Sequence, residues 1–344
     1  MVFVMGKERS GTTLLQTFLG GNPNIVAPPE YDFIVLLYPR FGKIKKWREK
    51  DILDFIEQLY AEQWISKVWH LDRDLLTSIL LSIKDQADYP CICKVVYYCM
   101  RGTKENILWI SDKNPMYVLF IKTILKIFPD AKFIHLIRDP RDNVNSHLQA
   151  FSVTNVKFIT MKWLSYNTIL LKSRNKYPEK CYAVLYEDLV QDPEACMKGI
   201  CGFLKISFTD KMIQNTFPSR LENLGNQKEL LGSAKAIHAN LLKPVNTSNI
   251  GKWKTGMPPE DIGIVEKITG DFASKNFNYI MSEGYNKTST RINIQILKAK
   301  IIYYSWQFFT RMKFKSYRFN IFYTRTNLRI GRQTRVFERI LKGI

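Results

Sequence analysis

The sequence is poor in the residues that build metal centres and disulfide frameworks. Its 344 residues include only four histidines, which are scattered, and six cysteines without a paired metal-ligand spacing. Several of these cysteines lie in apolar runs, where a reduced cysteine packs as a small hydrophobic side chain. We therefore expect no metal ion in the functional site and a reducing compartment for the chain.

Long hydrophobic runs are also missing. The apolar run from Met1 to Met5 is too short for the core of a signal peptide. The longest uncharged stretch near the C-terminus, Ile301 to Thr310, is well below the roughly 18 to 20 apolar residues that cross a bilayer. These absences predict a cytoplasmic protein without a membrane-spanning segment.

Acidic residues are scarce at one end of the chain. Residues 287–344 contain fourteen Lys or Arg residues and one acidic residue, Glu338, so this segment carries +13 of the net charge of +20. Aromatic residues are interleaved with the cations, particularly over residues 291–344. We expect a basic C-terminal helical extension. It either packs on the domain through its aromatic face or docks on an anionic membrane at the inner face, and no nucleic-acid-binding module is recognisable in it.

Short apolar strands alternate with helical patterns along residues 1–286, which we expect to form one domain. Helices are expected over residues 50–66, 71–84, 115–128 and 156–176, and strands over residues 25–27, 107–110, 132–137 and 181–186. This alternation predicts an α/β fold of three layers, in which a central, mostly parallel sheet is flanked by helices. Residues 45–105 read as a helical insertion in that domain.

The opening segment connects an apolar strand to an apolar helix through a turn bounded by Gly6 and Gly11. Main-chain N–H groups in such a turn, together with the positive end of the helix, bind phosphate. The spacing is P-loop-like, but Thr12 stands where a P-loop has its lysine. Because nucleoside triphosphatases use that lysine at the β- and γ-phosphates, we expect a site for a nucleotide phosphate without triphosphate hydrolysis.

A second phosphate site is expected at Arg138, which directly follows a strand. Ser146 lies about two helical turns further on, so a guanidinium and a hydroxyl are available for a phosphate distinct from the one at Arg9. The alternative is that Arg138 forms a surface ion pair with Asp139 or Asp142.

Several polar residues fall at the carboxyl ends of the expected strands. In a parallel sheet these ends meet at one edge, which is where ligands bind. The residues are Ser10, Glu30, Lys113, Arg138 and Tyr186.

These motifs together resemble the sulfotransferases that use 3′-phosphoadenosine-5′-phosphosulfate (PAPS), and most closely the tyrosylprotein and carbohydrate branch. Arg9 to Thr13 is similar to their 5′-phosphosulfate loop, and Phe133 to Ser146 to their 3′-phosphate motif. Tyr186-Glu-Asp-Leu189 is similar to the segment beside the adenine. The segments Lys243 to Asn246 and Gly251 to Trp253 resemble the late region that closes over the cofactor.

The resemblance implies a role for each matching residue. Glu30 would be the general base, and Lys113 would stabilise charge on the bridging oxygen. The alternatives are a turn or salt-bridge carboxylate for Glu30 and a solvated lysine at a helix start for Lys113. PAPS would be the co-substrate, 3′-phosphoadenosine 5′-phosphate (PAP) the product, and no metal would be needed. The implied cofactor-binding residues are Arg9, Ser10, Gly11, Thr12, Thr13, Arg138, Ser146, Tyr186, Asn246 and Lys252.

The acceptor is expected to be a hydroxyl group, with a saccharide favoured over a tyrosine or a lipid-linked glycan. This preference rests on departures from the tyrosylprotein pattern. Ala150 stands in place of a further arginine, and Ile237 or His238 in place of an assisting serine. Two other functions remain open: a nucleotide kinase-like enzyme, which the missing lysine disfavours, and a non-catalytic nucleotide- or polyanion-binding protein, which would need neither Glu30 nor Lys113.

Overall fold

The computed structural model describes residues 1–61, 69, 71–100, 104–151, 155–214, 245–285 and 290–315. Its centre is a five-stranded sheet, all parallel, in the order β2-β3-β1-β4-β5. The strands are β1 (Val2–Met5), β2 (Ile25–Val26), β3 (Trp109–Lys113), β4 (Lys132–Ile137) and β5 (Cys181–Leu185). The predicted parallel α/β sheet is confirmed.

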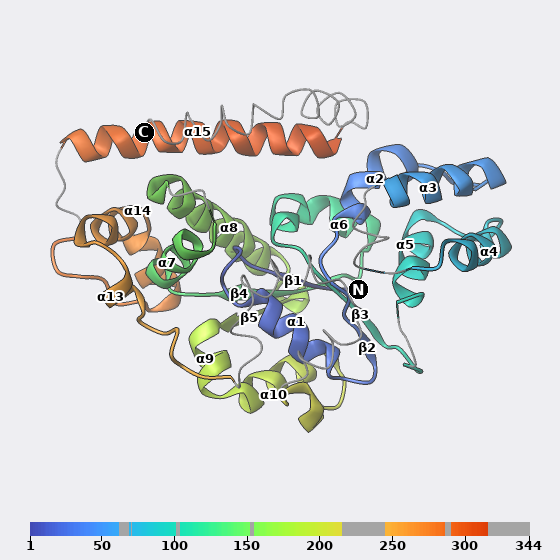
Figure 1. Ribbon diagram of the computed structural model, residues 1–344, viewed down its shortest axis with the longest axis horizontal. Coiled ribbons are helices and arrows are strands. Elements are labelled where there is room, and N and C mark those ends of the chain that lie inside the picture. The colour runs from blue at the N-terminus through green and yellow to red at the C-terminus, as the bar shows by residue number, and fades with distance from the viewer. Residues whose placement is uncertain are drawn as a thin grey trace.

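The central strand β1 shows why the sheet is covered on both faces. Its side chains alternate, so Val2 and Val4 enter one apolar cluster while Phe3 and Met5 enter another. The first cluster includes α1 (Thr12–Gly20) and α10 (Pro193–Leu204), and the second includes α6 (Ile121–Ile127) and part of α8 (Val156–Lys176). In Figure 1 these groups lie on opposite sides of the sheet, which confirms the three layers.

The remaining described helices complete the two outer layers. Short α9 follows β5 on the side of α10, while α7 and α14 lie beside α8 on the other side (Figure 1). Their bounds are α7 (Pro140–Ala150), α9 (Tyr186–Gln191), α13 (Trp253–Gly256) and α14 (Pro259–Phe277), with single-turn 3₁₀ helices η3 (Pro178–Lys180) and η4 (Asp210–Met212).

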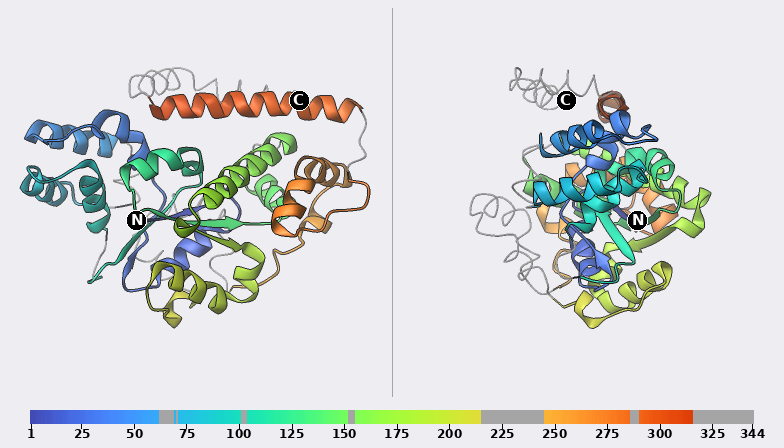
Figure 2. Two further views of the ribbon diagram at one scale, coloured as in Figure 1. Left: turned by 180° about the vertical axis from the view of Figure 1, so that it is seen from behind. Right: turned by 90° about the vertical axis from the view of Figure 1, so that its right-hand side faces the viewer.

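Four helices extend the molecule beyond the β2 edge of the sheet, as Figures 1 and 2 show. Asp72 and Asp88 cap two of them, because each carboxylate accepts hydrogen bonds from main-chain N–H groups of the first turn. They are α2 (Phe33–Phe41), α3 (Glu49–Ala61), α4 (Arg73–Ile83) and α5 (Tyr89–Tyr98). The helical character expected between residues 45 and 105 is therefore present in the described part.

The structure corrects two expected boundaries. The strand expected over residues 107–110 is β3 (Trp109–Lys113), because main-chain pairing with β1 continues until Lys113 lies opposite Val4. An apolar pattern could not show this, since Ser111 and Asp112 are polar but buried. After Pro115 the chain first forms a 3₁₀ helix, η2 (Pro115–Phe120), and only then α6.

The C-terminal extension is a long helix, α15 (Thr290–Lys315), which lies against the outer side of α8 (Figures 1 and 2). Tyr303 and Phe314 are buried against the domain, with ring centroids 5.6 Å from Phe158 and 4.9 Å from Phe120. The expected helical extension with an aromatic face packed on the domain is thus present over residues 290–315. None of the described helices is long and apolar enough to span a membrane.

Candidate active site

The turn after β1 has the backbone of an anion site. Gly11 adopts φ of 92° and immediately precedes α1, whose N-terminus has no side-chain cap and no acidic residue in its first turn. A Cβ atom at Gly11 would lie 2.5 Å from the Tyr186 ring. The glycine is therefore required both by its left-handed conformation and by the ring packed against it.

Helix α7 holds this turn from the side. The amide of Asn143 donates hydrogen bonds to the hydroxyl of Ser10 at 2.9 Å and to the main-chain oxygen of Glu8 at 3.0 Å. Ser10 and Asn143 are both buried. Asn143 is not among the residues predicted from the sequence, although its place directly after Asp142 in the second predicted phosphate motif was a usable signal.

Arg138, which belongs to the second predicted phosphate motif, contacts the first. Its guanidinium donates to the main-chain oxygens of Arg9 at 2.9 Å and Asn249 at 2.8 Å, and lies over the Tyr186 ring at 4.5 Å. The side chain is buried, so a surface ion pair with Asp139 or Asp142 is not the arrangement that the structure adopts. Asp139 instead forms an ion pair with Arg141.

Ser146 joins the first motif directly. Its hydroxyl accepts a hydrogen bond of 3.1 Å from Nε of Arg9, whose guanidinium also lies 6.0 Å from the centre of the Phe151 ring. Burial and the nearby Arg138 lower the pKa of Arg9 below its ordinary value. Arg9, Arg138 and Ser146 therefore form one continuous group at the start of α1.

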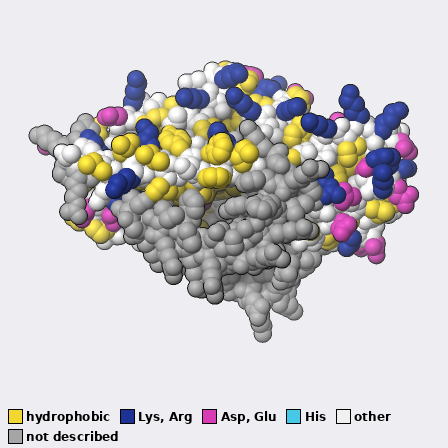
Figure 3. Space-filling view, turned by 90° about the horizontal axis from the view of Figure 1, so that it is seen from above, with side chains coloured by type: hydrophobic (Ala, Val, Ile, Leu, Met, Phe, Trp, Pro, Cys, Tyr) yellow, Lys and Arg dark blue, Asp and Glu magenta, His cyan; other side chains and the backbone are white. Residues whose placement is uncertain are grey.

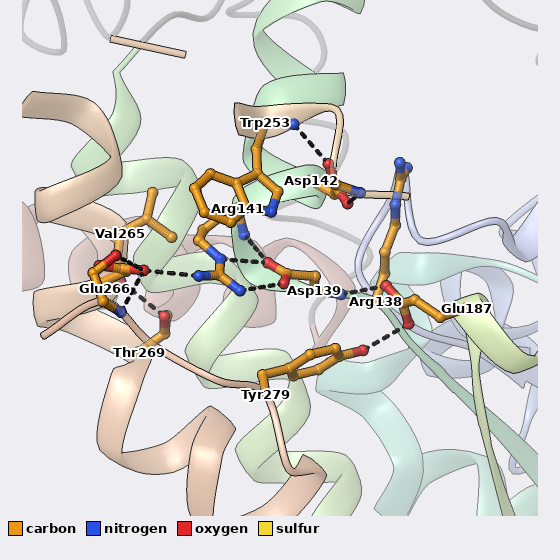
Figure 4. A network of polar contacts seen from close by, with 12 residues as sticks. Arg138, Asp139, Arg141, Asp142, Glu187, Trp253, Val265, Glu266, Thr269 and Tyr279 are labelled. Carbon is orange, nitrogen blue, oxygen red and sulfur yellow. Dashed lines mark hydrogen bonds and ion pairs between the residues drawn. The ribbon is translucent and has the colours of Figure 1, made fainter. Parts of the chain in front are cut away.

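Asp142 fastens the late segment of the chain to this group. Its carboxylate accepts hydrogen bonds from the main-chain N–H groups of Gly251 at 2.7 Å and Trp253 at 2.9 Å, as Figure 4 shows in part. Burial raises the pKa of Asp142, while Arg138 and these hydrogen bonds lower it. Lys252 lies between the two anchored residues, and its side chain is exposed.

A buried polar network supports the helix that follows Arg138 (Figure 4). Arg141 grips the carboxylate of Asp139 with two hydrogen bonds of 3.0 and 2.6 Å and contacts Glu266 of α14 at 2.8 Å. Glu187 accepts from the main-chain N–H of Asp139 at 3.0 Å and from the hydroxyl of Tyr279 at 2.8 Å. Asp139 also caps α7, as expected from the sequence, by accepting from the main-chain N–H of Arg141.

The predicted base and its cation partner are in contact. Lys113, the last residue of β3, forms an ion pair with Glu30. The side chain of Glu30 is 42% exposed and that of Lys113 only 10%. The carboxylate thus faces solvent, where an acceptor can reach it, whereas the ammonium group lies deeper in the protein.

Gln16 places this pair beside the anion site. Its side-chain amide donates to the main-chain oxygens of Pro28 at 3.0 Å and Ser111 at 2.9 Å, and accepts from the hydroxyl of Ser111 at 2.7 Å. Gln16 belongs to α1. Pro28 lies two residues before Glu30, and Ser111 lies two residues before Lys113. The helix that begins at the predicted phosphate turn therefore also holds both segments that carry the ion pair.

Asp112, next to Lys113, is a buried carboxyl of a different kind. The hydroxyl of Tyr97 donates a hydrogen bond of 2.6 Å to it, and burial raises its pKa to about 7. It is the partner of a core tyrosine, and Glu30 remains the carboxylate exposed at the sheet edge.

A buried charge cluster under the turn was not anticipated. Lys7 is fully buried, and its ammonium donates to Nδ1 of His147 at 3.2 Å. Burial lowers the pKa of Lys7 to about 7, and burial together with Lys7 lowers that of His147 to about 3. Lys162 of α8 forms an ion pair of 2.7 Å with Glu8, whose pKa lies well below its usual range because of Lys162 and Lys7.

The sequence-predicted residues fall into two groups in the structure. Most converge at the start of α1 and the carboxyl ends of β1, β3, β4 and β5: Arg9, Ser10, Gly11, Thr12, Thr13, Glu30, Lys113, Arg138, Ser146 and Tyr186. Asn246 and Lys252 are exposed on the segment that Asp142 and Arg138 anchor. Lys243, Ile237 and His238 lie outside the described residues.

Curated relatives match much of the chain. A protein-tyrosine sulfotransferase A of Caenorhabditis elegans is 26% identical over 270 residues, which cover 76% of this chain and 62% of that protein. A protein-tyrosine sulfotransferase 1 of Danio rerio is 26% identical over 276 residues, covering 76% of this chain and 67% of the relative. The chain thus spans 62% of the length of the Caenorhabditis elegans protein and 67% of the length of the Danio rerio protein.

Solved structures show the same fold. The sulfotransferase domain from the Synechococcus PCC 7002 olefin synthase aligns with a TM-score of 0.52 at 23% identity, covering 82% of this chain and 95% of that domain. The model of the sulfotransferase family matches residues 2–210, which include the phosphate turn, the Glu30–Lys113 pair, Arg138 and Tyr186. With a match over more than half its length, the chain belongs to the sulfotransferase family.

Proposed function

We propose that this chain transfers the sulfuryl group of PAPS to a hydroxyl acceptor, with Glu30 as the general base. The observation that carries the proposal is the contact between Lys113 and Glu30 at the sheet edge where α1 begins. A carboxylate open to solvent, a cation behind it and an anion-binding helix start are the three elements that the reaction needs in one place.

The residues present fit PAPS. The uncapped N-terminus of α1 offers main-chain N–H groups, and Arg9 and Arg138 add two guanidinium groups beside it. Nε of Arg138 is buried and has no hydrogen-bond partner among the described residues, so part of this side chain still has a donor to offer. Arg9, Ser10 and the first residues of α1 would hold the 5′-phosphosulfate, and Arg138 with Ser146 the 3′-phosphate.

PAPS supplies the activated sulfuryl group. Glu30 accepts the proton of the acceptor hydroxyl while the oxygen of that hydroxyl forms its bond to sulfur. The bond between sulfur and the phosphate oxygen breaks with its electron pair, and Lys113 and Arg9 stabilise the negative charge on the departing PAP. Gln16 fastens α1 to β3, and Asn143 of α7 holds the turn that precedes α1, so these groups keep their relative positions.

We place a tyrosine hydroxyl first among acceptors, because the curated relatives carry the name protein-tyrosine sulfotransferase. The exposure of the Glu30 side chain supports an acceptor carried by a macromolecule, which can reach a carboxylate at the protein surface. The saccharide expected from the sequence is the alternative, and it is the second arm of the test.

The proposal is tested by incubating the protein with PAPS labelled in its sulfuryl group, an acidic tyrosine-containing peptide, its tyrosine-to-phenylalanine counterpart, and a panel of oligosaccharides. Label in the tyrosine peptide alone supports the tyrosine acceptor, and label in a sugar supports the alternative. Binding of PAP without label transfer to any hydroxyl would refute the enzymatic proposal and favour a nucleotide-binding protein. Phosphate transfer from ATP would favour the kinase.

A further inference from the structure

Helix α15 carries an apolar stripe on the side that faces away from the domain. The stripe is made of side chains that are each between 50 and 60% exposed and are spaced alternately three and four residues apart: Ile294, Leu297, Ile301, Tyr304 and Phe308. This spacing places all five along one line of the helix surface. Figure 3 looks down on this side of the molecule and shows hydrophobic side chains gathered in a band along it, with Lys and Arg around them.

The stripe is not explained by packing on the domain, because the opposite face of α15 does that. Ala299, Tyr303 and Phe314 are buried, and the Trp306 ring lies 5.8 Å from Phe158 of α8. Scattered exposed apolar residues are ordinary on a protein surface, but a continuous row about 21 Å long on one helix marks an interaction surface. α15 is therefore apolar on two faces, of which one packs on the domain and the other is exposed to solvent.

The charges around the stripe indicate the partner. Residues 290–315 contain six Lys or Arg residues and no acidic residue. Lys298 and Lys300 are exposed, and by helical spacing they flank the stripe on its two sides. Self-association through this face would bring the lysines of two copies into one seam without a carboxylate from either helix to offset them. An anionic lipid surface satisfies both features, since apolar side chains enter the headgroup boundary while lysines bind the lipid phosphates.

We propose that α15 lies flat on an anionic membrane, with the stripe from Ile294 to Phe308 inserted at the boundary between headgroups and acyl chains. Lys298 and Lys300 contact the negatively charged headgroups. Because Tyr303 and Phe314 keep the helix fixed to the domain, the surface is preformed and needs no folding step on binding. The proposal concerns the described helix alone and does not depend on which acceptor the enzyme uses.

The test is co-sedimentation of the full chain with vesicles of phosphatidylcholine mixed with phosphatidylserine, and with vesicles of phosphatidylcholine alone. We expect the parent protein to bind the anionic vesicles. In the double variant Ile301→Ser/Phe308→Ser this binding should fall at least about tenfold, since each substitution removes an apolar side chain that would be buried in the membrane. The double variant Lys298→Gln/Lys300→Gln should lose about tenfold on anionic vesicles only. The matched control is Leu75→Ser/Ile280→Ser, which removes exposed apolar side chains of α4 and the loop after α14 and should change nothing.

Thermal unfolding and PAP binding of all variants show whether each is folded, since none of these residues lies in the site. If the Ile301→Ser/Phe308→Ser variant sedimented with anionic vesicles as well as the parent protein does, the proposal would be overturned. The basic segments that remain would then account for vesicle binding without the stripe. Equal loss in the Leu75/Ile280 control would also overturn it. A dimer in analytical ultracentrifugation that the Ile301→Ser/Phe308→Ser variant converts to a monomer, with no vesicle binding by either, would assign the stripe to a second copy instead.

Discussion

The guanidinium of Arg138 donates a hydrogen bond of 2.9 Å to the main-chain oxygen of Arg9, across a separation of 129 residues in the sequence. The contact joins the two predicted phosphate motifs through the backbone of the first and the side chain of the second. A second contact joins the same two segments: Nε of Arg9 donates a hydrogen bond to the hydroxyl of Ser146, eight residues beyond Arg138. A change at either arginine is therefore expected to disturb both phosphate positions together.

Arg138→Lys should weaken PAP binding by roughly tenfold to a hundredfold, because an ammonium group cannot reproduce the planar fork that reaches Arg9, Asn249 and the Tyr186 ring. Isothermal titration calorimetry with PAP measures the effect. The control is Arg48→Lys, which alters an exposed ion pair with Asp51 and should leave PAP affinity unchanged. Equal affinity for PAP in the Arg138 variant and the parent protein would contradict the assignment.

Glu30→Gln should lower kcat by about 10² to 10⁴, the usual range for loss of a general base, while PAP affinity stays the same. The amide keeps the size of the side chain but cannot accept the acceptor's proton at neutral pH. Single-turnover transfer from labelled PAPS is the measurement, with the exposed Glu57→Gln of α3 as the matched control. Full activity of Glu30→Gln would show that another group serves as the base.

Gly11→Ala should destabilise the fold by about 1 to 3 kcal/mol and abolish tight PAP binding, because the new methyl group meets the Tyr186 ring at 2.5 Å and the backbone has φ of 92°. The matched control is Gly202→Ala in the exposed part of α10, where an added Cβ meets nothing within 4 Å. That variant should gain about 0.5 to 1 kcal/mol, since alanine favours a helix over glycine. Urea denaturation compares the two, and equal effects would refute the special role of Gly11.

Lys7→Met should change how stability depends on pH. Burial lowers the pKa of Lys7 from its ordinary value of 10.5 to about 7, so the unfolded chain binds more protons than the folded one between these two values. The free energy of unfolding of the parent protein must therefore rise with pH across this window relative to that of Lys7→Met, and below about 7 the buried ammonium imposes its full cost.

The measurement is urea denaturation of both proteins at intervals from neutral to alkaline pH. The exposed Lys50→Met, in α3, serves as the control and should give a curve parallel to that of the parent protein. A constant difference between Lys7→Met and the parent at every pH would show that Lys7 titrates normally in the fold.

Local chemistry explains what the sequence alone determined. The order of strands and helices, the glycine turn before α1 and the cap of Asp139 with Pro140 on α7 depend on neighbouring residues only. Periodicity, glycine spacing and capping report on such short-range structure. Since the family's phosphate motifs are also short, membership of the sulfotransferase family could be predicted before the fold was known, and the match over residues 2–210 confirms it.

Tertiary structure decided everything that depends on residues far apart in the chain. No local pattern reveals that certain distant segments lie together. Lys7 is buried against His147, Gln16 bonds to Pro28 and Ser111, and Arg9 bonds to Ser146. The end of β3 at Lys113 followed from backbone pairing with β1, because buried polar residues hide a strand from an apolar pattern. Likewise the sequence showed that residues 291–315 mix aromatics with cations, but only packing on α8 separated the face that is covered from the face that remains exposed.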